Sequence, residues 1–304
     1  MINLYQKQIS RELFNGVGEK LTLIQLQRKA NDIREDIISM LEAAGSGHCA
    51  GSLDLADIVA ALYFNIMNIN PQNPDWADRD VFFLSNGHTV PVQYAAMAEA
   101  GYFDKSELLT LRKLGSRLQG HPERIKLPGI ENTSGPLGSG LSQAAGYAYS
   151  LQYLDDSKHR FVYCIMGDGE LDEGNNWEAA MFAGKYKLSQ LIAFIDRNNI
   201  QIDGNTEDVM PLENLVDKWE SFGWHVIEID GHNIQSVIDA VNTAKAITNR
   251  PSVIIAHTIP GKGVDFMEYD YRWHGVAPNS EQAKSALKKL RTLDGKISSG
   301  DYNE

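Results

Sequence analysis

The chain has 304 residues, of which 43% are hydrophobic, enough to bury a substantial core as one large α/β domain or as two. Its 28 basic and 40 acidic residues give a formal net charge of −12, which disfavours nucleic acids and anionic membranes as partners. No run approaches the roughly 18 apolar residues of a membrane span, and the N-terminus has no apolar signal segment, so we expect a soluble cytoplasmic protein. Two cysteines cannot supply a disulfide framework.

The N-terminal part predicts an arm, a helix and a small-residue loop. Residues 1–20 are polar and irregular, so we expect an arm. Thr22 and Gln25 fit a capping box, and apolar residues then recur at helical spacing until Gly45. In the loop that follows, small residues surround His48. Such a loop suits a ligand that approaches the backbone closely, although a simple connection between helices also uses glycine.

Next come a second helix and a strand. Ser52 is expected to cap a helix from Leu53 to Met67, which leads into a strand from Val81 to Leu84. His88 follows that strand, at the carboxyl edge where open α/β sheets bind ligands, although a turn histidine that caps a helix is the plainer interpretation. Cys49 beside His48 suggests a thiol nucleophile, but adjacency alone does not make a catalytic pair.

A glycine-rich segment precedes the next helix. A helical pattern from Lys105 to Leu114 comes before His121, which by itself is an ordinary loop histidine. The run 129–140 is too rich in glycine to form an element, yet it leads directly into an apolar helix, Leu141 to Leu154. We expect this run to bring the backbone close to something flat or crowded.

Two buried strands flank a crossover helix in the middle of the chain. Phe161 to Met166 and Leu191 to Ile195 are apolar without alternation, as in parallel strands covered on both faces. The helix between them runs roughly from Asn175 to Tyr186. Because a right-handed crossover brings both strand ends to the same edge, Asp168 and Asn198 are expected to lie side by side.

These two side chains predict a metal site. Carboxylate and amide oxygens are hard donors, and with a backbone carbonyl, a water and two phosphate oxygens they complete an octahedral Mg²⁺ shell. The missing ligands therefore indicate a diphosphate, which Gly167 and Gly169 allow to approach the backbone. A plain glycine turn is the alternative. A nicotinamide-binding Rossmann site is disfavoured, because the third glycine of its motif would fall on Asp172.

The rest of the chain continues the alternation of helices and strands, which predicts an open, mostly parallel sheet with helices on both faces. We expect helices at Leu212 to Phe222 and Ile234 to Thr248, and strands at Trp224 to Ile229 and Ser252 to Thr258. The predicted domain spans residues 21–295 and is followed by a polar tail, 296–304. The acidic residues Glu170, Asp172, Glu173 and Glu178 fall in the first turns of the crossover helix, where the helix dipole favours them.

Gly167-Asp168-Gly169, followed by Asn198-Asn199, resembles the thiamine diphosphate fingerprint. The chain from about residue 20 to about residue 290 resembles the N-terminal, diphosphate-binding half of transketolase. The resemblance implies a thiamine diphosphate (PP) binding domain whose Mg²⁺, or Ca²⁺, is held by Asp168, Asn198 and the carbonyl of Ile200.

The resemblance also assigns roles to loops throughout the chain. It places His48, His121 and His274 at the substrate as catalytic residues and His88 at the diphosphate, with His274 reaching both. Residues assigned to the cofactor are His88, Gly135, Pro136, Leu137, Gly167, Asp168, Gly169, Glu173, Asn198 and His274. It places Glu173 and Glu178 at a subunit interface, and Lys262 is a candidate to neutralise the diphosphate. Cys49-Ala50 replaces the family's usual Pro-Gly beside His48.

One half of the expected site has no counterpart in this sequence. In transketolases a second, pyrimidine-binding domain supplies the glutamate that activates the cofactor and most of the residues that hold the sugar phosphate. The resemblance therefore implies a split transketolase of the pentose phosphate pathway that transfers a two-carbon ketol unit. Its C-terminal partner subunit would carry that glutamate, in an α2β2 heterotetramer. Other substrates remain open, namely a sulfosugar, a branched pentulose phosphate or the pyruvate of deoxyxylulose-phosphate synthases, as does a non-catalytic interaction subunit.

Overall fold

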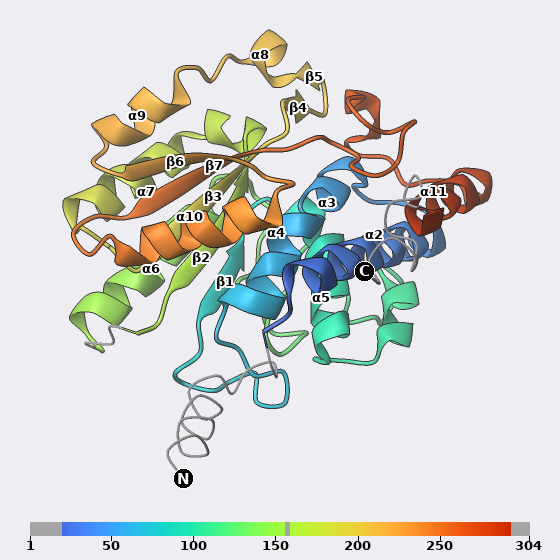
Figure 1. The fold of residues 1–304 in the computed structure, drawn as a ribbon, viewed down its shortest axis with the longest axis horizontal. Coiled ribbons are helices and arrows are strands. Elements are labelled where there is room, and N and C mark those ends of the chain that lie inside the picture. Colours follow the sequence, from blue (N-terminus) through green and yellow to red (C-terminus); the bar gives the residue numbers. More distant parts are fainter. Residues whose placement is uncertain (1–19, 156–158, 293–304) are drawn as a thin grey trace.

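The computed structural model describes residues 20–155 and 159–292, and a five-stranded sheet lies at its centre (Figure 1). The strand order is β1-β2-β3-β7-β6, and every neighbouring pair is parallel. The strands are β1 (Val81–Leu84), β2 (Val162–Gly167), β3 (Leu191–Arg197), β6 (His225–Asp230) and β7 (Ser252–His257). The predicted parallel sheet is confirmed.

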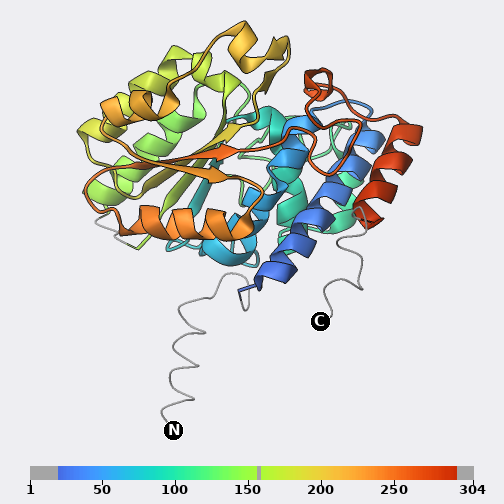
Figure 2. The same cartoon turned by 45° about the horizontal axis from the view of Figure 1, so that its top comes forward.

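Helices cover both faces of this sheet, as the uninterrupted apolar strands predict (Figure 2). One face carries α2 (Leu23–Ala44), α4 (Ala56–Ala61), α5 (Val90–Ala100) and α10 (Ile234–Ala246), with α11 (Ser280–Thr292) packed on α2. The other carries α6 (Gly140–Tyr153), α7 (Gly174–Lys185) and α9 (Leu215–Ser221). Phe82 and Leu84 of β1 point to the first core, and Val81 and Phe83 to the second.

The first helix follows the predicted pattern closely. Thr22 and Gln25 form the capping box, and Gly45 ends α2 in the left-handed conformation, at φ 66°. The predicted helix from Leu53 to Met67 is wrong in its boundaries. It begins earlier, as α3 (Ala50–Asp54), so Ser52 lies within it and its hydroxyl donates to the carbonyl of His48 instead of capping.

The same segment continues as α4 and then as a π-helical turn, η1 (Leu62–Ile66). Nearly all of it is buried, so no solvent-facing side marks where one piece ends and the next begins.

A second boundary error lies before His121. The structure has a 3₁₀ helix, η3 (Lys105–Thr110), in place of the helix predicted to reach Leu114. Leu111 leaves the helical conformation with a ψ of 130°, and Arg112 then adopts a φ of 60°. The Arg112 N–H donates to the carbonyl of Leu118 at 2.9 Å. This closes a tight turn that leads toward His121.

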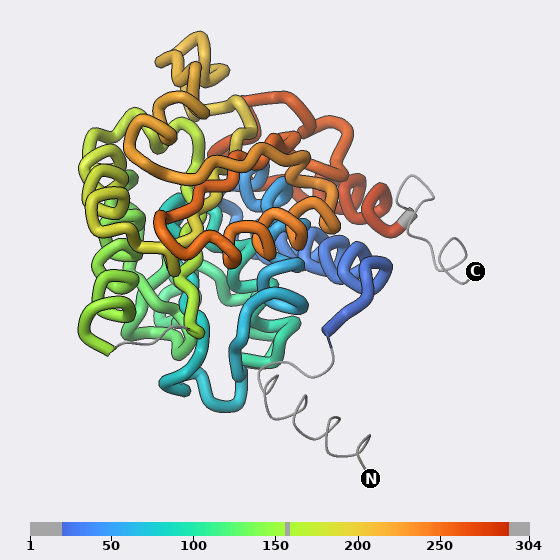
Figure 3. Tube along the Cα trace, turned by 60° about the vertical axis from the view of Figure 1, so that its left-hand side comes forward, coloured from blue at the N-terminus to red at the C-terminus, as the bar shows by residue number. Residues whose placement is uncertain are grey.

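A small hairpin that the sequence analysis missed projects from the carboxyl edge of the sheet (Figure 3). It consists of β4 (Ile200–Gln201), β5 (Gly204–Asn205) and α8 (Thr206–Val209). Two-residue strands are too short to produce a periodic pattern.

Other short turns are η2 (Gly87–Thr89), η4 (Gly169–Asp172) and η5 (Tyr271–Trp273). None of the helices within the two described ranges is long and apolar enough to cross a membrane. The predicted arm, apart from Lys20, and the predicted polar tail lie outside the described residues.

Candidate functional site

A cavity of about 290 Å³ lies at the carboxyl ends of β1, β2 and β3. The predicted residues that line it are His48, His88, His121, His274, Gly135, Leu137, Gly167, Asp168, Gly169, Asn198 and Ile200. They come from seven separate segments of the chain. The topology brings them together because parallel strands place the loops that follow them along one edge of the sheet.

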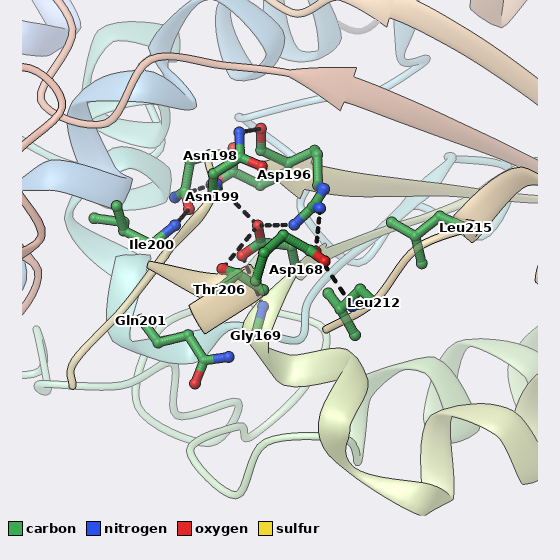
Figure 4. Close-up of polar contacts among 12 residues, drawn as sticks. Asp168, Gly169, Asp196, Asn198, Asn199, Ile200, Gln201, Thr206, Leu212 and Leu215 are labelled. Carbon is green, nitrogen blue, oxygen red and sulfur yellow. Dashed lines mark hydrogen bonds and ion pairs between the residues drawn. The ribbon is translucent and has the colours of Figure 1, made fainter. Parts of the chain in front are cut away.

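Asp168 follows β2 and is buried, with its carboxylate at the centre of a hydrogen-bond network (Figure 4). Oδ2 accepts from Arg197 Nη1 (2.9 Å), from the Asn199 N–H (2.9 Å) and from the Thr206 hydroxyl (3.2 Å). Oδ1 accepts only from the Gly169 N–H, at 2.7 Å. Burial raises the pKa of Asp168, and the Arg197 guanidinium opposes that rise. Oδ1 is therefore the oxygen with coordination capacity left.

Asn198 follows β3, and its amide orientation is fixed by two carboxylates. Its Nδ2 donates to Asp54 at 3.0 Å and to Asp196 at 3.1 Å, so its Oδ1 faces away from this acidic pair. That Oδ1 accepts from the Ile200 N–H at 3.1 Å and has a further lone pair. Burial raises the pKa of Asp54 and raises that of Asp196 to about 7.

The donor set fits a hard divalent cation. Asp168, Asn198 and the Ile200 carbonyl offer oxygen ligands only, as Mg²⁺ and Ca²⁺ require. No group of three or more His, Cys, Asp or Glu in the described ranges would hold a metal, but this set contains only one such side chain. Because Arg197 already offsets the charge of Asp168, a cation held here needs further negative ligands, as a diphosphate would provide.

Arg197 is a site residue that the sequence analysis missed. It ends β3, is buried, and pairs with Asp168, with Glu207 at 2.5 Å and with Glu213 at 2.9 Å. A charged residue at the end of an otherwise apolar strand was the available clue. It ties the strand end to the segment that carries α8 and thereby fixes the Asp168 carboxylate.

Three histidines that line the cavity form a triangle. Ring centroids are 4.8 Å apart for His48 and His88, 5.6 Å for His48 and His274, and 5.1 Å for His88 and His274. Burial lowers the pKa of all three, to about 4 for His48. These imidazoles are neutral at pH 7 and able to accept protons.

Three residues that line the cavity carry buried polar atoms without protein partners. Nδ1 of His48, Nδ1 of His274 and Oδ1 of Asn86 are buried and accept or donate no hydrogen bond within the described residues. Buried polar groups are normally satisfied, so such atoms are typical of a surface that serves a ligand. His121 is more exposed, and burial together with the nearby Arg112 lowers its pKa.

Glu170 is a second residue with an unforeseen role. The helix dipole was the expected explanation, but Glu170 is buried in the η4 turn. Its carboxylate accepts from the Ser85 hydroxyl, from the Gly138 N–H at 2.7 Å and from the Gly167 N–H at 3.1 Å. The Glu170 side chain therefore connects three of the segments that form the cavity.

Four predicted residues do not line the cavity. They are Pro136, Glu173, Glu178 and Lys262. Glu173 and Glu178 are exposed, and the stem of Glu173 lies against the glycine-rich loop, since a Cβ on Gly138 would be 2.6 Å from Glu173 Cβ. The interface role predicted for both glutamates stays a prediction.

The fold and this cavity define a parallel α/β domain that holds a phosphorylated cofactor at its carboxyl edge. Residues 25–295 match the family model described as "Transketolase, thiamine diphosphate binding domain". The chain belongs to that family.

Its relatives include both separate subunits and single-chain enzymes. It is 46% identical to the 6-deoxy-6-sulfo-D-fructose transketolase subunit SqwG of Clostridium sp. strain MSTE9, over 88% of this chain and 96% of that protein. It is 39% identical to a subunit of the apulose-4-phosphate transketolase of Phocaeicola vulgatus, over 88% and 93%. Human transketolase is also 39% identical, over 87% of this chain but only 42% of its own length.

The solved structures give the same result for the fold. Transketolase from Campylobacter jejuni superposes with a TM-score of 0.83 at 33% identity, covering 90% of this chain and 43% of that one. The predicted fold class and family are confirmed.

Proposed function

We propose that this chain is the N-terminal subunit of a split transketolase, which transfers a two-carbon ketol unit from a ketose phosphate to an aldose phosphate. The observation that supports it most is the length of its relatives. The chain covers 93–98% of separate transketolase subunits but 42% of the human single-chain enzyme. Its partner would supply the pyrimidine-binding domain and the activating glutamate, in an α2β2 heterotetramer of the cytoplasm that serves the pentose phosphate pathway.

The residues of the cavity have distinct tasks in this function. Asp168, Asn198 and the Ile200 carbonyl would hold Mg²⁺ with the diphosphate. Gly167, Gly169 and Gly135 would allow the cofactor to approach the backbone, and Leu137 would support the rest of it. The bound thiamine diphosphate supplies the carbon nucleophile that the side chains of proteins lack. His88 and His274 contact the diphosphate.

The histidines carry out the proton transfers. His48, His121 and His274 accept and return protons at the hydroxyl and carbonyl oxygens of the sugar. Their lowered pKa values keep the rings neutral at pH 7, so each has a free nitrogen lone pair for this work.

Cofactor binding separates this function from that of a non-catalytic interaction subunit. We expect calorimetric titration of the complex of both subunits with thiamine diphosphate to give saturable binding in Mg²⁺ or Ca²⁺ and none in excess chelator. Absence of binding under both conditions would leave only the interaction role.

The named relatives set the substrates to compare. A sulfosugar and a branched pentulose phosphate stand beside the ordinary ketose phosphates, because related subunits are named for such donors. We expect the complex to use at least one ketose from this panel. Turnover of pyruvate alone would place the chain with deoxyxylulose-phosphate synthases instead.

A further inference from the structure

Arg112 lies in the turn between η3 and His121, and its side chain lies beside the loops that carry two histidines of the cavity, His48 and His121. Its backbone has a φ of 60°, which is uncommon for a residue other than glycine, and its N–H is held by the Leu118 carbonyl at 2.9 Å. The turn therefore fixes the direction in which this arginine leaves the backbone.

The guanidinium rests on the two glycines that directly precede His48 and His121. Its Nη2 lies 3.4 Å from the Gly120 carbonyl, and a Cβ on Gly120 would be 3.0 Å from its Nε and Cζ. A Cβ on Gly47 would be 3.6 Å from the same Nε. The cation is thus placed between the two histidine loops, and side chains at these glycines would crowd it.

Arg112 forms no salt bridge with any carboxylate in residues 20–155 and 159–292. Other arginines do: Arg117 of the same turn pairs with Glu107 at 2.7 Å, and Arg79 pairs with Glu131 at 2.6 Å. Burial lowers the pKa of Arg112, and its charge in turn lowers the pKa of His48 and His121. Arg112 is exposed and has no carboxylate partner among the described residues, so its guanidinium is accessible to an anion, and its planar fork matches tetrahedral oxyanions.

We propose that Arg112 binds the terminal phosphate or sulfonate of the sugar substrate, so that this chain itself contributes to recognition of the anionic group. The inference rests on the proposed ketol transfer, and it identifies the terminal anion as the part of the substrate that the site binds. It adds a residue of this chain to the phosphate-binding residues, most of which are expected on the partner subunit. The donors in the names of two relatives, a sulfosugar and a sugar phosphate, share such a terminal anion.

The first test compares a charged and a neutral donor in the complex of both subunits. For Arg112→Gln we expect the ratio of KM for fructose 6-phosphate to KM for erythrulose to rise about tenfold, the loss expected for one charge-assisted hydrogen bond. Arg112→Lys should restore part of the ratio. Arg117→Gln, which removes a paired cation from the same turn, should leave it at the wild-type value.

An unchanged ratio would overturn the assignment. If both KM values change by the same factor, Arg112 acts only on the histidines or the loop, and if neither changes, Arg112 has no part in donor binding. The same KM assay with the sulfonated ketose as a second charged donor shows whether the site binds phosphate, sulfonate or both.

A second test does not depend on turnover, so it separates this inference from the proposed function. If the wild-type complex transfers a ketol unit from no donor, the proposed function fails, and inorganic phosphate titrated into the full chain decides the role of Arg112. We expect saturable shifts of the His48 and His121 imidazole resonances in the wild type and none in Arg112→Gln. Identical behaviour of the two proteins would contradict the assignment.

Discussion

The two carboxylate oxygens of Asp168 have different hydrogen-bond partners. Oδ2 is committed to Arg197, Asn199 and Thr206, whereas Oδ1 has one donor and faces the cavity. Replacement by alanine would also remove the partner of a buried guanidinium, so asparagine is the sharper substitution.

We expect Asp168→Asn to weaken Mg²⁺-dependent cofactor binding by more than the roughly 10–100-fold that loss of an outer-shell partner causes. Calorimetric titration of the complex measures this affinity. Asp172→Asn is the matched control, since Asp172 is exposed on the same turn and only accepts from Gln201 at 3.1 Å. Unchanged affinity in Asp168→Asn would remove Asp168 from the metal site.

His121 differs from the other histidines in exposure and position. It lies outside the triangle of His48, His88 and His274, on the glycine-rich side of the cavity, 3.6 Å from a Cβ placed on Gly135. We expect His121→Ala to lower kcat by about 10²-fold or more while cofactor affinity stays close to wild type. Weaker cofactor binding with a normal kcat at saturating cofactor would instead assign this ring to the diphosphate.

The lowered pKa of His48 also makes stability depend on pH. This imidazole titrates at about 4 in the folded chain against 6.5 when unperturbed. Between those values the unfolded chain binds the proton and the folded chain does not, so stability present above pH 6.5 is lost as the pH falls toward 4.

Urea denaturation at pH 7 and pH 5 should therefore show a smaller loss of unfolding free energy for His48→Gln than for the wild type. Equal losses in the two proteins would contradict the depressed pKa. His88→Gln is expected to behave in the same way, because burial also lowers the pKa of His88.

Two helical glycines on the same face of the sheet predict opposite effects of one substitution. A Cβ on Gly184 of α7 would lie 2.0 Å from the Phe222 carbonyl oxygen, whereas one on Gly146 of α6 would have no atom within 4 Å. Gly184→Ala should reduce the free energy of unfolding by about 1–3 kcal/mol through overpacking. Gly146→Ala should raise it by about 0.5–1 kcal/mol through helix propensity. Chemical denaturation decides the signs, and a stabilised Gly184→Ala would refute the close packing of α7.

Local chemistry determined which elements were predictable. The capping box at Thr22, the left-handed Gly45 and the uninterrupted apolar strands are signals carried by neighbouring residues, and each was predicted correctly. The helix after His48 was misjudged because burial on all sides removes the amphipathic pattern. The helix η3 ends early because Leu111 and Arg112 adopt non-helical backbone conformations that their residue types do not predict.

Among the site residues, too, local sequence signals were predictable and tertiary contacts were not. Asp168 and Asn198 follow strands, so topology alone predicts that they meet, and the resemblance supplied the histidines. Arg197 and Glu170 were missed because their partners lie far along the chain: Glu213 for the first, Ser85 for the second. Such contacts are determined by tertiary packing, which single-sequence patterns do not encode.

At the scale of the whole molecule, the proposed function gives this chain one side of a catalytic site. The oxygen donors of Asp168 and Asn198, the glycine turn and four histidines line one cavity. The chain aligns with nearly the full length of separate transketolase subunits and with about two fifths of the single-chain enzymes. We therefore expect catalysis to require a second polypeptide.

Ketol transfer by the purified chain, measured with and without the purified C-terminal partner, tests this central claim most directly. With thiamine diphosphate and Mg²⁺ present, we expect no turnover by either polypeptide alone and activity that rises with added partner until the two are equimolar. Robust ketol transfer by this chain without a partner would contradict the split site.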